Sequence, residues 1–186
     1  VKGKTVVPEE KKVYLAFNKP RGIVCTAEKR EKNNVIDYLS YPVRIYPVGR
    51  LDKDSEGLLL MTNDGAIVNG IMRARNRHEK EYQVEVNKEI TPEFLKKMAS
   101  GVPILDTVTR PCRIRKTGER SFTIILTQGL NRQIRRMCEA LGYRVTKLKR
   151  VRIMNIHLKD LKTGEYRPLT EKELAELKKQ IGEEKR

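Results

Sequence analysis

A polar loop between two glycines, followed at once by an apolar run, is the feature that most constrains the fold of this chain. The loop spans residues 49–57 and carries three acids, Asp52, Asp54 and Glu56, and the apolar run is Leu58-Leu59-Leu60-Met61. A short apolar run bounded by glycine predicts a strand buried in a core. The loop therefore enters a rigid element, and a loop held in this way can present a functional side chain. Each of the three acids is a candidate for that role.

Strand and helix patterns follow one another irregularly along the rest of the chain. Short apolar or alternating stretches predict strands at residues 13–17, 23–26, 58–62, 81–86, 112–115 and 122–127, and further strands within 143–158. Helical spacing predicts a short helix at 35–39 and longer ones at 65–73, 91–101, 131–142 and 170–181. Because this order is not a simple βαβ alternation, we expect an α+β fold with a mixed or antiparallel central sheet flanked by helices.

Two of these helices carry clear end signals. Asn131 is the expected N-cap of the helix that ends at Gly142, and Ile134, Met137, Cys138 and Leu141 recur on its apolar face. We assign Met137 and Cys138 to the core. The last helix is expected to begin with a capping box formed by Thr170 and Glu173.

The chain has 186 residues, enough for one core or for one core divided into two lobes. No apolar run approaches the ~20 residues that a membrane-spanning helix needs, so we expect no membrane contact. Three widely spaced cysteines, Cys25, Cys112 and Cys138, favour a reducing, cytoplasmic setting over a disulfide framework. Only two histidines, His78 and His157, are present, which leaves little material for a His-based metal site or a Ser-His-Asp triad.

The net charge of +16 points to a polyanionic partner such as nucleic acid. Between Arg110 and Arg152 thirteen Lys and Arg residues stand against two acids, so this segment carries +11 of the +16. Contacts from such a segment to phosphates would be salt-dependent and largely independent of sequence. The alternative is a solvated basic surface that only maintains solubility.

Four short motifs, in this order along the chain, resemble those of RNA pseudouridine synthases. They are Asn18-Lys19-Pro20-Arg21-Gly22, Gly49-Arg50-Leu51-Asp52, Lys80-Glu81-Tyr82 and Asn131-Arg132-Gln133-Ile134-Arg135-Arg136-Met137. Within that family, residues 129–139 and 152–155 resemble the branch named after the small-subunit ribosomal synthase A, and in it most closely the large-subunit synthases F. The resemblance covers residues 13–169 and implies the fold of that family, with a catalytic cleft between two lobes.

Members of this branch usually carry an RNA-binding S4 module before the catalytic domain. The resemblance therefore implies a remnant of that module or a linker at residues 1–10, a catalytic domain at 11–182 and a frayed tail at 183–186. It also implies isomerisation of a uridine to pseudouridine, with large-subunit (23S) ribosomal RNA as the expected target and a transfer RNA anticodon as the alternative. We expect no cofactor, no metal and a monomer.

The resemblance implies three catalytic residues. Asp52 is the reacting carboxylate, Tyr82 is the surface on which the base stacks, and Arg135 is the basic partner that keeps Asp52 ionised in a partly desolvated site. At about 4 Å and an effective dielectric near 20, that attraction is roughly 4 kcal/mol, which is comparable to a typical burial shift. Asp54 is expected to support the loop. RNA contacts are implied for Arg50, Leu51, Lys53, Arg132, Gln133, Ile134 and Arg136.

Two other functional classes fit the same residues. A non-catalytic RNA-binding protein of ribosome assembly would need the same basic surface. A metal-dependent nuclease would use Asp52, Asp54 and Glu56 as a cluster of oxygen ligands.

Overall fold

The computed structural model of the protein describes residues 11–183. The predicted module remnant at 1–10 and residues 184–186 of the predicted tail lie outside this range. Within it, no helix combines the length and the hydropathy needed to cross a bilayer.

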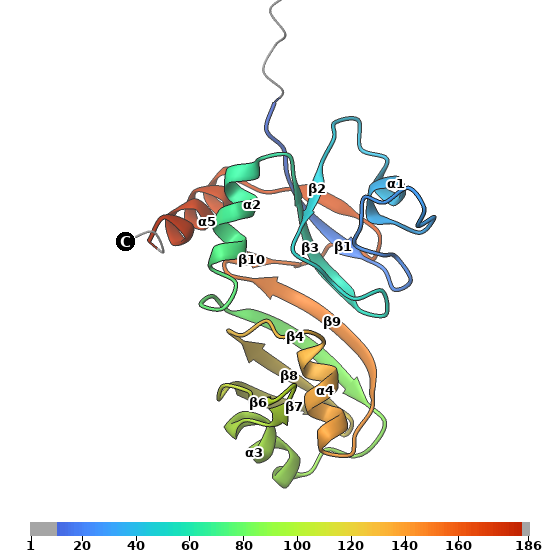
Figure 1. The fold of residues 1–186 in the computed structure, drawn as a ribbon, viewed down its shortest axis with the longest axis vertical. Coiled ribbons are helices and arrows are strands. Elements are labelled where there is room, and N and C mark those ends of the chain that lie inside the picture. Colours follow the sequence, from blue (N-terminus) through green and yellow to red (C-terminus); the bar gives the residue numbers. More distant parts are fainter. Residues whose placement is uncertain (1–10, 184–186) are drawn as a thin grey trace, which may run out of the picture.

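One large mixed sheet runs through the molecule, with strands in the order β11-β1-β3-β9-β4-β8-β7 (Figure 1). β2 pairs with β3, and β10 pairs with β9. The pairing of β3 with β9 is parallel and the other pairings in this sheet are antiparallel. This confirms the predicted α+β class. The strands are β1 (Tyr14–Lys19), β2 (Tyr46–Val48), β3 (Glu56–Thr62), β4 (Lys80–Val86), β7 (Arg113–Gly118), β8 (Ser121–Leu126), β9 (Val145–Ile153), β10 (Ile156–His157) and β11 (Tyr166–Pro168).

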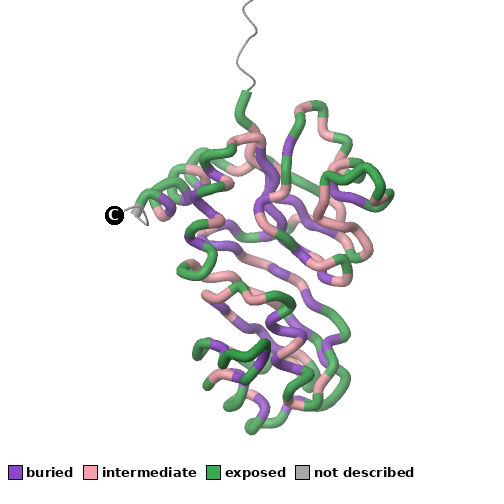
Figure 2. The backbone as a smooth tube through the Cα atoms, in the orientation of Figure 1, coloured by how far each residue is buried: buried purple, intermediate pink, exposed green. Residues whose placement is uncertain are grey.

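The helices pack on this sheet in two separate groups, and each group with its strands forms one lobe (Figure 1). In one lobe, α3 (Pro92–Ser100) and α4 (Gln133–Ala140) pack on β4, β8 and β9, and the hairpin of β5 (Pro103–Ile104) and β6 (Thr107–Val108) lies beside them. In the other lobe, α2 (Gly65–Arg73) and α5 (Glu171–Glu183) pack on β1 and β3 through one cluster, and α1 (Val35–Leu39) packs through a separate cluster. Buried residues follow the strands through both lobes, whereas α5 is exposed along most of its length (Figure 2).

The predicted buried strand lies where the two lobes meet. Leu58, Leu59 and Met61 in β3 are fully buried. Gly57 stands opposite Arg150 of β9 at the parallel pairing. Its φ is +109°, and a Cβ atom added to it would overlap the backbone of Arg150. Glycine is therefore required here for two reasons, and this close approach fixes the end of the polar loop against the strand that both lobes share.

Two predicted elements differ from the structure. Residues 23–26 do not form a strand, and only Val24 makes an isolated bridge, to Asn34. The reason is that the buried ammonium of Lys19 takes the carbonyl oxygens of Pro20 and Ile23, both at 2.8 Å, which wraps the chain around it. The last helix continues through Glu183, two residues beyond its predicted end.

The N-cap of α4 is Arg132, in the left-handed region at φ 49°, and not Asn131. The Asn131 side chain instead accepts a hydrogen bond from Arg136 at 2.9 Å. The capping box is confirmed, because the Thr170 N–H donates to Glu173 Oε1 at 2.9 Å and the Glu173 N–H donates to Thr170 Oγ1 at 3.1 Å. Met137 and Cys138 are fully buried, which confirms their assignment to the core.

The substitution Gly57→Ala tests the close approach of β3 and β9. We expect it to lower the free energy of unfolding by at least about 2 kcal/mol, since the positive φ is strained for alanine and the Cβ atom overlaps the Arg150 backbone. The matched control is Gly65→Ala, where an added Cβ meets nothing within 4 Å. We expect that variant to be unchanged or more stable by up to about 1 kcal/mol in urea denaturation. Equal effects of the two substitutions would contradict this account of the junction.

Candidate active site

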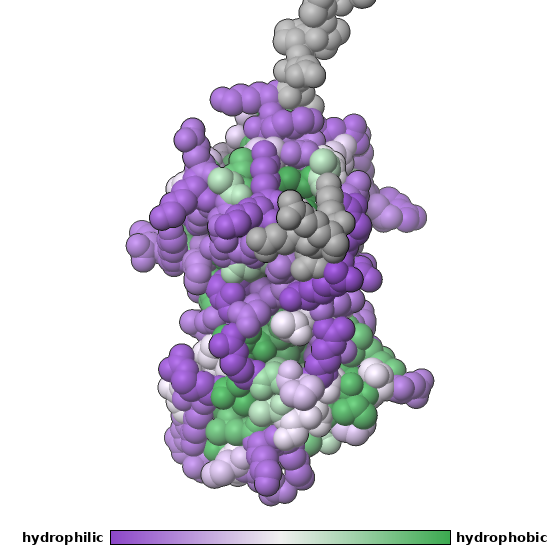
Figure 3. All heavy atoms as spheres, turned by 90° about the vertical axis from the view of Figure 1, so that its left-hand side faces the viewer, coloured by the Kyte–Doolittle hydropathy of each residue, from purple (hydrophilic) through white to green (hydrophobic). Residues whose placement is uncertain are grey.

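A cavity of about 340 Å³ lies between the lobes. Most of the residues predicted from the motifs line it, although they come from distant parts of the chain: Arg50, Leu51, Asp52, Tyr82, Arg132, Gln133, Ile134 and Arg135. Lys53 and Arg136 are not among its lining residues. A band of hydrophilic side chains crosses the middle of the molecule between the lobes, whereas hydrophobic ones gather on the lower part of the same face (Figure 3). The motifs are thus brought together at one cavity, whose lining combines these charged and polar residues with apolar ones such as Ile71, Leu126 and Leu148.

The loop that carries Asp52 is held by its own backbone and by the core below it. The N–H of Ser55 donates to the carbonyl of Asp52 at 3.0 Å, which closes a tight turn. Leu51 is buried, and its N–H donates to Cys25 Sγ at 3.3 Å. The carbonyl of Lys53 accepts from the N–H of Gly22 at 2.7 Å. With Leu51 anchored in the core, the next side chain, Asp52, lines the cavity and remains about one third exposed.

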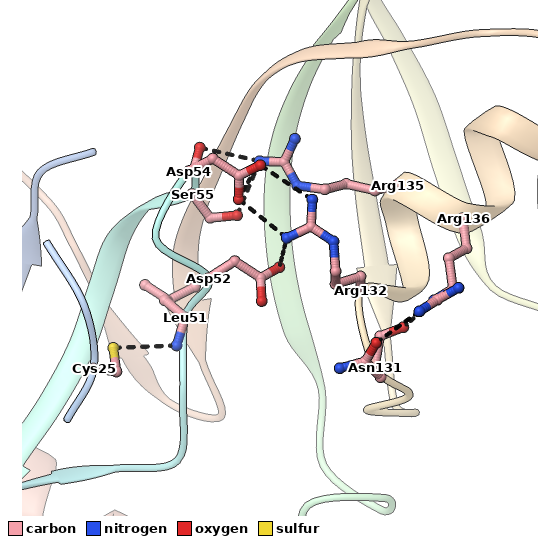
Figure 4. A network of polar contacts seen from close by, with 9 residues as sticks. All are labelled: Cys25, Leu51, Asp52, Asp54, Ser55, Asn131, Arg132, Arg135 and Arg136. Atoms are coloured by element: carbon pink, nitrogen blue, oxygen red, sulfur yellow. Dashed lines mark hydrogen bonds and ion pairs between the residues drawn. The ribbon is translucent and has the colours of Figure 1, made fainter. Parts of the chain in front are cut away.

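Arg132 binds both acids of this loop (Figure 4). Its Nη1 lies 3.3 Å from Asp52 Oδ2, and its two terminal nitrogens donate to the two oxygens of Asp54 at 3.2 and 3.1 Å. This hydrogen bonding holds the pKa of the Asp54 carboxyl below its usual value, and the nearby charge of Arg135 acts in the same direction. Asp54 is therefore ionised at neutral pH and serves to fix Arg132 beside Asp52.

Arg135 is the most buried of the arginines at the start of α4, with its side chain 10% exposed. Its Nη2 donates to the carbonyl of Asp54 and to Ser55 Oγ, both at 3.0 Å, and lies 3.6 Å from Asp54 Oδ1. We predicted Arg135 as the partner of Asp52, whereas Arg132 makes that ion pair here. The reason is that Arg135 projects from the buried face of α4 onto the backbone at 54–55, while Arg132 stands at the cap and reaches further along the loop.

The other predicted RNA contacts occupy different positions. Arg136 folds back on Asn131, away from Asp52 (Figure 4). Lys53 and Arg50 are exposed, and Arg50 lies at the cavity. Gln133 is buried; its amide oxygen accepts from the Leu130 N–H at 3.2 Å, and its amide nitrogen donates to Gln128 at 3.2 Å. Gln133 therefore shapes the loop before α4.

The sheet forms the floor of the cavity. Tyr82 is half-buried on β4, packs against the core of its lobe and lines the cavity. Its cross-strand neighbour on β9 is Arg150, which also lines the cavity and is only 7% exposed. Lys80, two residues before Tyr82, lies on the same face of β4 because side chains alternate along a strand.

Sequence reasoning assigned no role to three buried or cavity-lining cations. Arg150 and Lys80 line the cavity, and Lys19 is fully buried in the first motif. The position of Lys80 at the cavity could have been predicted from the sequence, because a residue two positions before Tyr82 on a strand lies on the same face. Arg150 is one of thirteen basic residues between Arg110 and Arg152, and its burial distinguishes it from its neighbours Lys149 and Arg152, which the sequence pattern does not.

Among the described residues no group of three or more His, Cys, Asp and Glu side chains is arranged to hold a metal ion. The proposed metal ligands Asp52 and Asp54 are instead shared by Arg132. Glu56 does not line the cavity. The cluster that the nuclease alternative requires is therefore not formed by these three side chains.

The fold and this cavity define a class of protein. The family model described as RNA pseudouridylate synthase matches residues 13–140, and the chain belongs to that family. In a structural comparison, a crystal structure of a pseudouridylate synthase superposes with a TM-score of 0.82 at 30% identity, covering 92% of this chain and 76% of that one. The predicted family and fold are confirmed.

Similarity to individual proteins identifies the branch of the family. The dual-specificity RNA pseudouridine synthase RluF of Salmonella typhi is 54% identical over 97% of this chain, and that of Escherichia coli K12 is 52% identical over the same share. The chain spans 63% of the length of these two proteins. The ribosomal small subunit pseudouridine synthase A of Yersinia pestis is 35% identical over 87% of this chain and 71% of that protein, so the predicted branch is also confirmed.

The contrast between Arg135 and Arg136 tests which arginine supports the loop. We expect Arg135→Met to destabilise the protein by about 1–3 kcal/mol, because Ser55 and the carbonyl of Asp54 lose a buried donor. The matched control on the same helix, Arg136→Met, loses only contacts to Asn131 and should stay within about 0.5 kcal/mol of wild type. Urea denaturation measures both. If Arg136→Met were as unstable as Arg135→Met, the conclusion that Arg135 supports the loop would be wrong.

Proposed function

We propose that this protein isomerises a uridine to pseudouridine in RNA, with Asp52 as the reacting carboxylate. The observation that carries the proposal is the position of Asp52, which lines a cavity together with Tyr82 and is paired with an arginine. The guanidinium of Arg132 lies 3.3 Å from the Asp52 carboxylate and is the cationic partner of the proposed reacting group. Arg135 acts through Asp54 and Ser55 and holds the loop in place.

The reaction breaks the bond between the ribose anomeric carbon, C1′, and N1 of the base, and then joins C1′ to C5. Asp52 either attacks C1′ as a nucleophile or removes a proton from the neighbouring C2′. No change of oxidation state accompanies the rearrangement, and we propose that no cofactor takes part. The carboxylate, its arginine partner and a surface for the base are the groups that the chemistry needs.

The uridine must leave its stack to reach this cavity, which costs a few kcal/mol. Stacking on Tyr82 would return roughly 1–3 kcal/mol, so further contacts are needed. We propose that Arg50, which is exposed at the cavity two residues before Asp52, fills the gap that the base leaves. The remaining RNA contacts are proposed for Leu51, Lys53, Arg132, Gln133, Ile134 and Arg136.

We propose large-subunit ribosomal RNA as the target. Its support is the similarity to a Bacillus subtilis relative named ribosomal large subunit pseudouridine synthase B, 36% identical over 92% of this chain and 74% of that protein. The relatives' names favour ribosomal RNA over the transfer RNA alternative. We further propose that the protein acts as a monomer in the cytoplasm, where ribosomal RNA is modified.

The substitution Asp52→Asn separates the enzyme from a non-catalytic RNA-binding protein. We expect release of tritium from RNA labelled at C5 of uridine to stop, while RNA affinity is retained, since the amide cannot attack C1′ or accept a proton from C2′. Tritium release and filter binding on the same preparation measure both properties. Continued release from the variant would exclude Asp52 as the reacting group.

The matched control is Glu56→Gln, which changes another acid of the same loop that lies outside the cavity. We expect it to release tritium at the wild-type rate. The metal-dependent nuclease predicts the opposite: loss of activity on removal of Glu56, inhibition by a chelator, and shortened RNA on a denaturing gel.

A further inference from the structure

The floor of the cavity carries two cations that no carboxylate neutralises. In residues 11–183, neither Lys80 nor Arg150 forms an ion pair with an acid. Arg150 donates through Nε to the carbonyl of Leu58 at 2.9 Å and through Nη1 to that of Arg50 at 3.4 Å. Lys80 Nζ donates to the carbonyls of Arg75 and Thr127. Both side chains bind backbone oxygens, which carry no net charge.

Arg150 is buried and Lys80 is partly buried. Charges withdrawn from water without a counter-ion are costly, so a protein that keeps two of them beside a cavity has a use for the charge. Burial, together with the charges of Arg150, Arg75 and Arg110, lowers the pKa of Lys80 to about 8. Its ammonium is therefore still mostly charged at neutral pH. Among the described residues, the one carboxylate that lines the cavity, that of Asp52, is paired with Arg132, which also binds Asp54 behind it. The charge of Asp52 is thus compensated and the charges of the sheet floor are not.

The position of the two cations relative to Tyr82 indicates which anion they serve. Lys80 lies two residues before Tyr82 on the same face of β4, and Arg150 is its direct neighbour on β9. Side chains opposite one another on paired strands have Cβ atoms about 4.5–5.5 Å apart. A base stacked on Tyr82 would therefore lie over or beside both cations.

A uracil that leaves C1′ becomes an anion. When the C1′–N1 bond breaks, its electron pair stays on the base, and the charge spreads over N1, O2 and O4. Asp52 bonds to C1′ or takes the C2′ proton in the same step. After the base turns, C5 bonds to C1′. On the first route the bond between Asp52 and C1′ breaks in this step, and on the second route Asp52 returns its proton to C2′. The C5 proton then leaves, and N1 takes up a proton. Positive groups fixed where this charge develops would lower the barrier.

We propose that Lys80 and Arg150 stabilise the negative charge of the departing uracil while it turns over Tyr82. This inference rests on the proposed function. It assigns the two residues to the leaving base, whereas Asp52 and Arg132 act on the sugar. The competing explanation is that both cations only hold the backbone of the neighbouring loops.

The test compares two leaving groups in single-turnover reactions on the same RNA, one with uridine and one with 5-fluorouridine at the target position. Fluorine withdraws electrons and makes the departing base a more stable anion. Loss of each nucleoside is followed in nuclease digests. The variants are Lys80→Met, Lys80→Arg, Arg150→Met and Arg150→Lys, and the matched control is Lys147→Met, an exposed position on the same strand as Arg150 that does not line the cavity.

We expect Lys80→Met and Arg150→Met to slow the reaction of uridine by about tenfold or more, with RNA affinity within about twofold of wild type. The loss of rate on 5-fluorouridine should be several-fold smaller, because the fluorinated base is already a more stable anion. Lys80→Arg and Arg150→Lys, which keep the charge, should retain most of the rate. Lys147→Met should react like wild type on both RNAs.

Equal losses on the two RNAs, or losses as large in the charge-retaining variants, would overturn the proposal and leave only a structural role. Arg150→Met also removes two backbone hydrogen bonds, so its circular dichroism is compared with that of wild type; should it not fold, Lys80→Met alone decides the question. A wild-type protein that leaves uridine unchanged would instead contradict the proposed function itself. The two failures are therefore distinguishable.

Discussion

The rest of the site depends on the ion pairs and hydrogen bonds that two arginines make to one loop. Arg132 and Arg135, from the start of α4 in one lobe, bind the acids and the backbone at residues 52–55, which lead into β3 in the other lobe. These contacts join the two lobes across the cavity, and they also set the position of Asp52. Since Arg135 is buried and Asp54 is held ionised, the contact is a fixed part of the fold.

The parallel pairing of β3 with β9 supplies the second support of this loop. Gly57 allows the two backbones to meet, and Arg150 then reaches back to the carbonyl of Arg50. Asp52 therefore lies in a segment fixed from both ends, which is the rigidity that positioning a reacting carboxylate requires. On one side of the cavity the charge of Asp52 is balanced by Arg132, whereas Lys80 and Arg150 on the sheet have no acidic partner among the described residues. The sugar and the base of a bound nucleotide would therefore meet different electrostatic surroundings.

Local patterns were sufficient for most of the elements, although β2, β5, β6 and β11 were not predicted, and the gathering of the motifs was implied by the family resemblance. The glycine-bounded loop before an apolar run predicted a buried strand, and alternation or capping predicted β4, α3 and the box at Thr170. Details that depend on tertiary contacts were not predictable. The partner of Asp52 is set by the left-handed backbone of Arg132, and residues 23–26 follow the buried Lys19 and not their own strand propensity. Arg150 is distinguished by burial, which charge counting does not reveal.

The most direct test of the central claim, that Asp52 is the carboxylate presented to the target nucleotide, is a structure of the Asp52→Asn variant bound to uridine-containing RNA. The account predicts one nucleotide turned out of its stack into the cavity, with its base on Tyr82 and its C1′ and C2′ atoms next to the side chain at position 52. An RNA bound on the basic surface with the cavity empty, or a ribose placed against Asp54 and away from position 52, would contradict it.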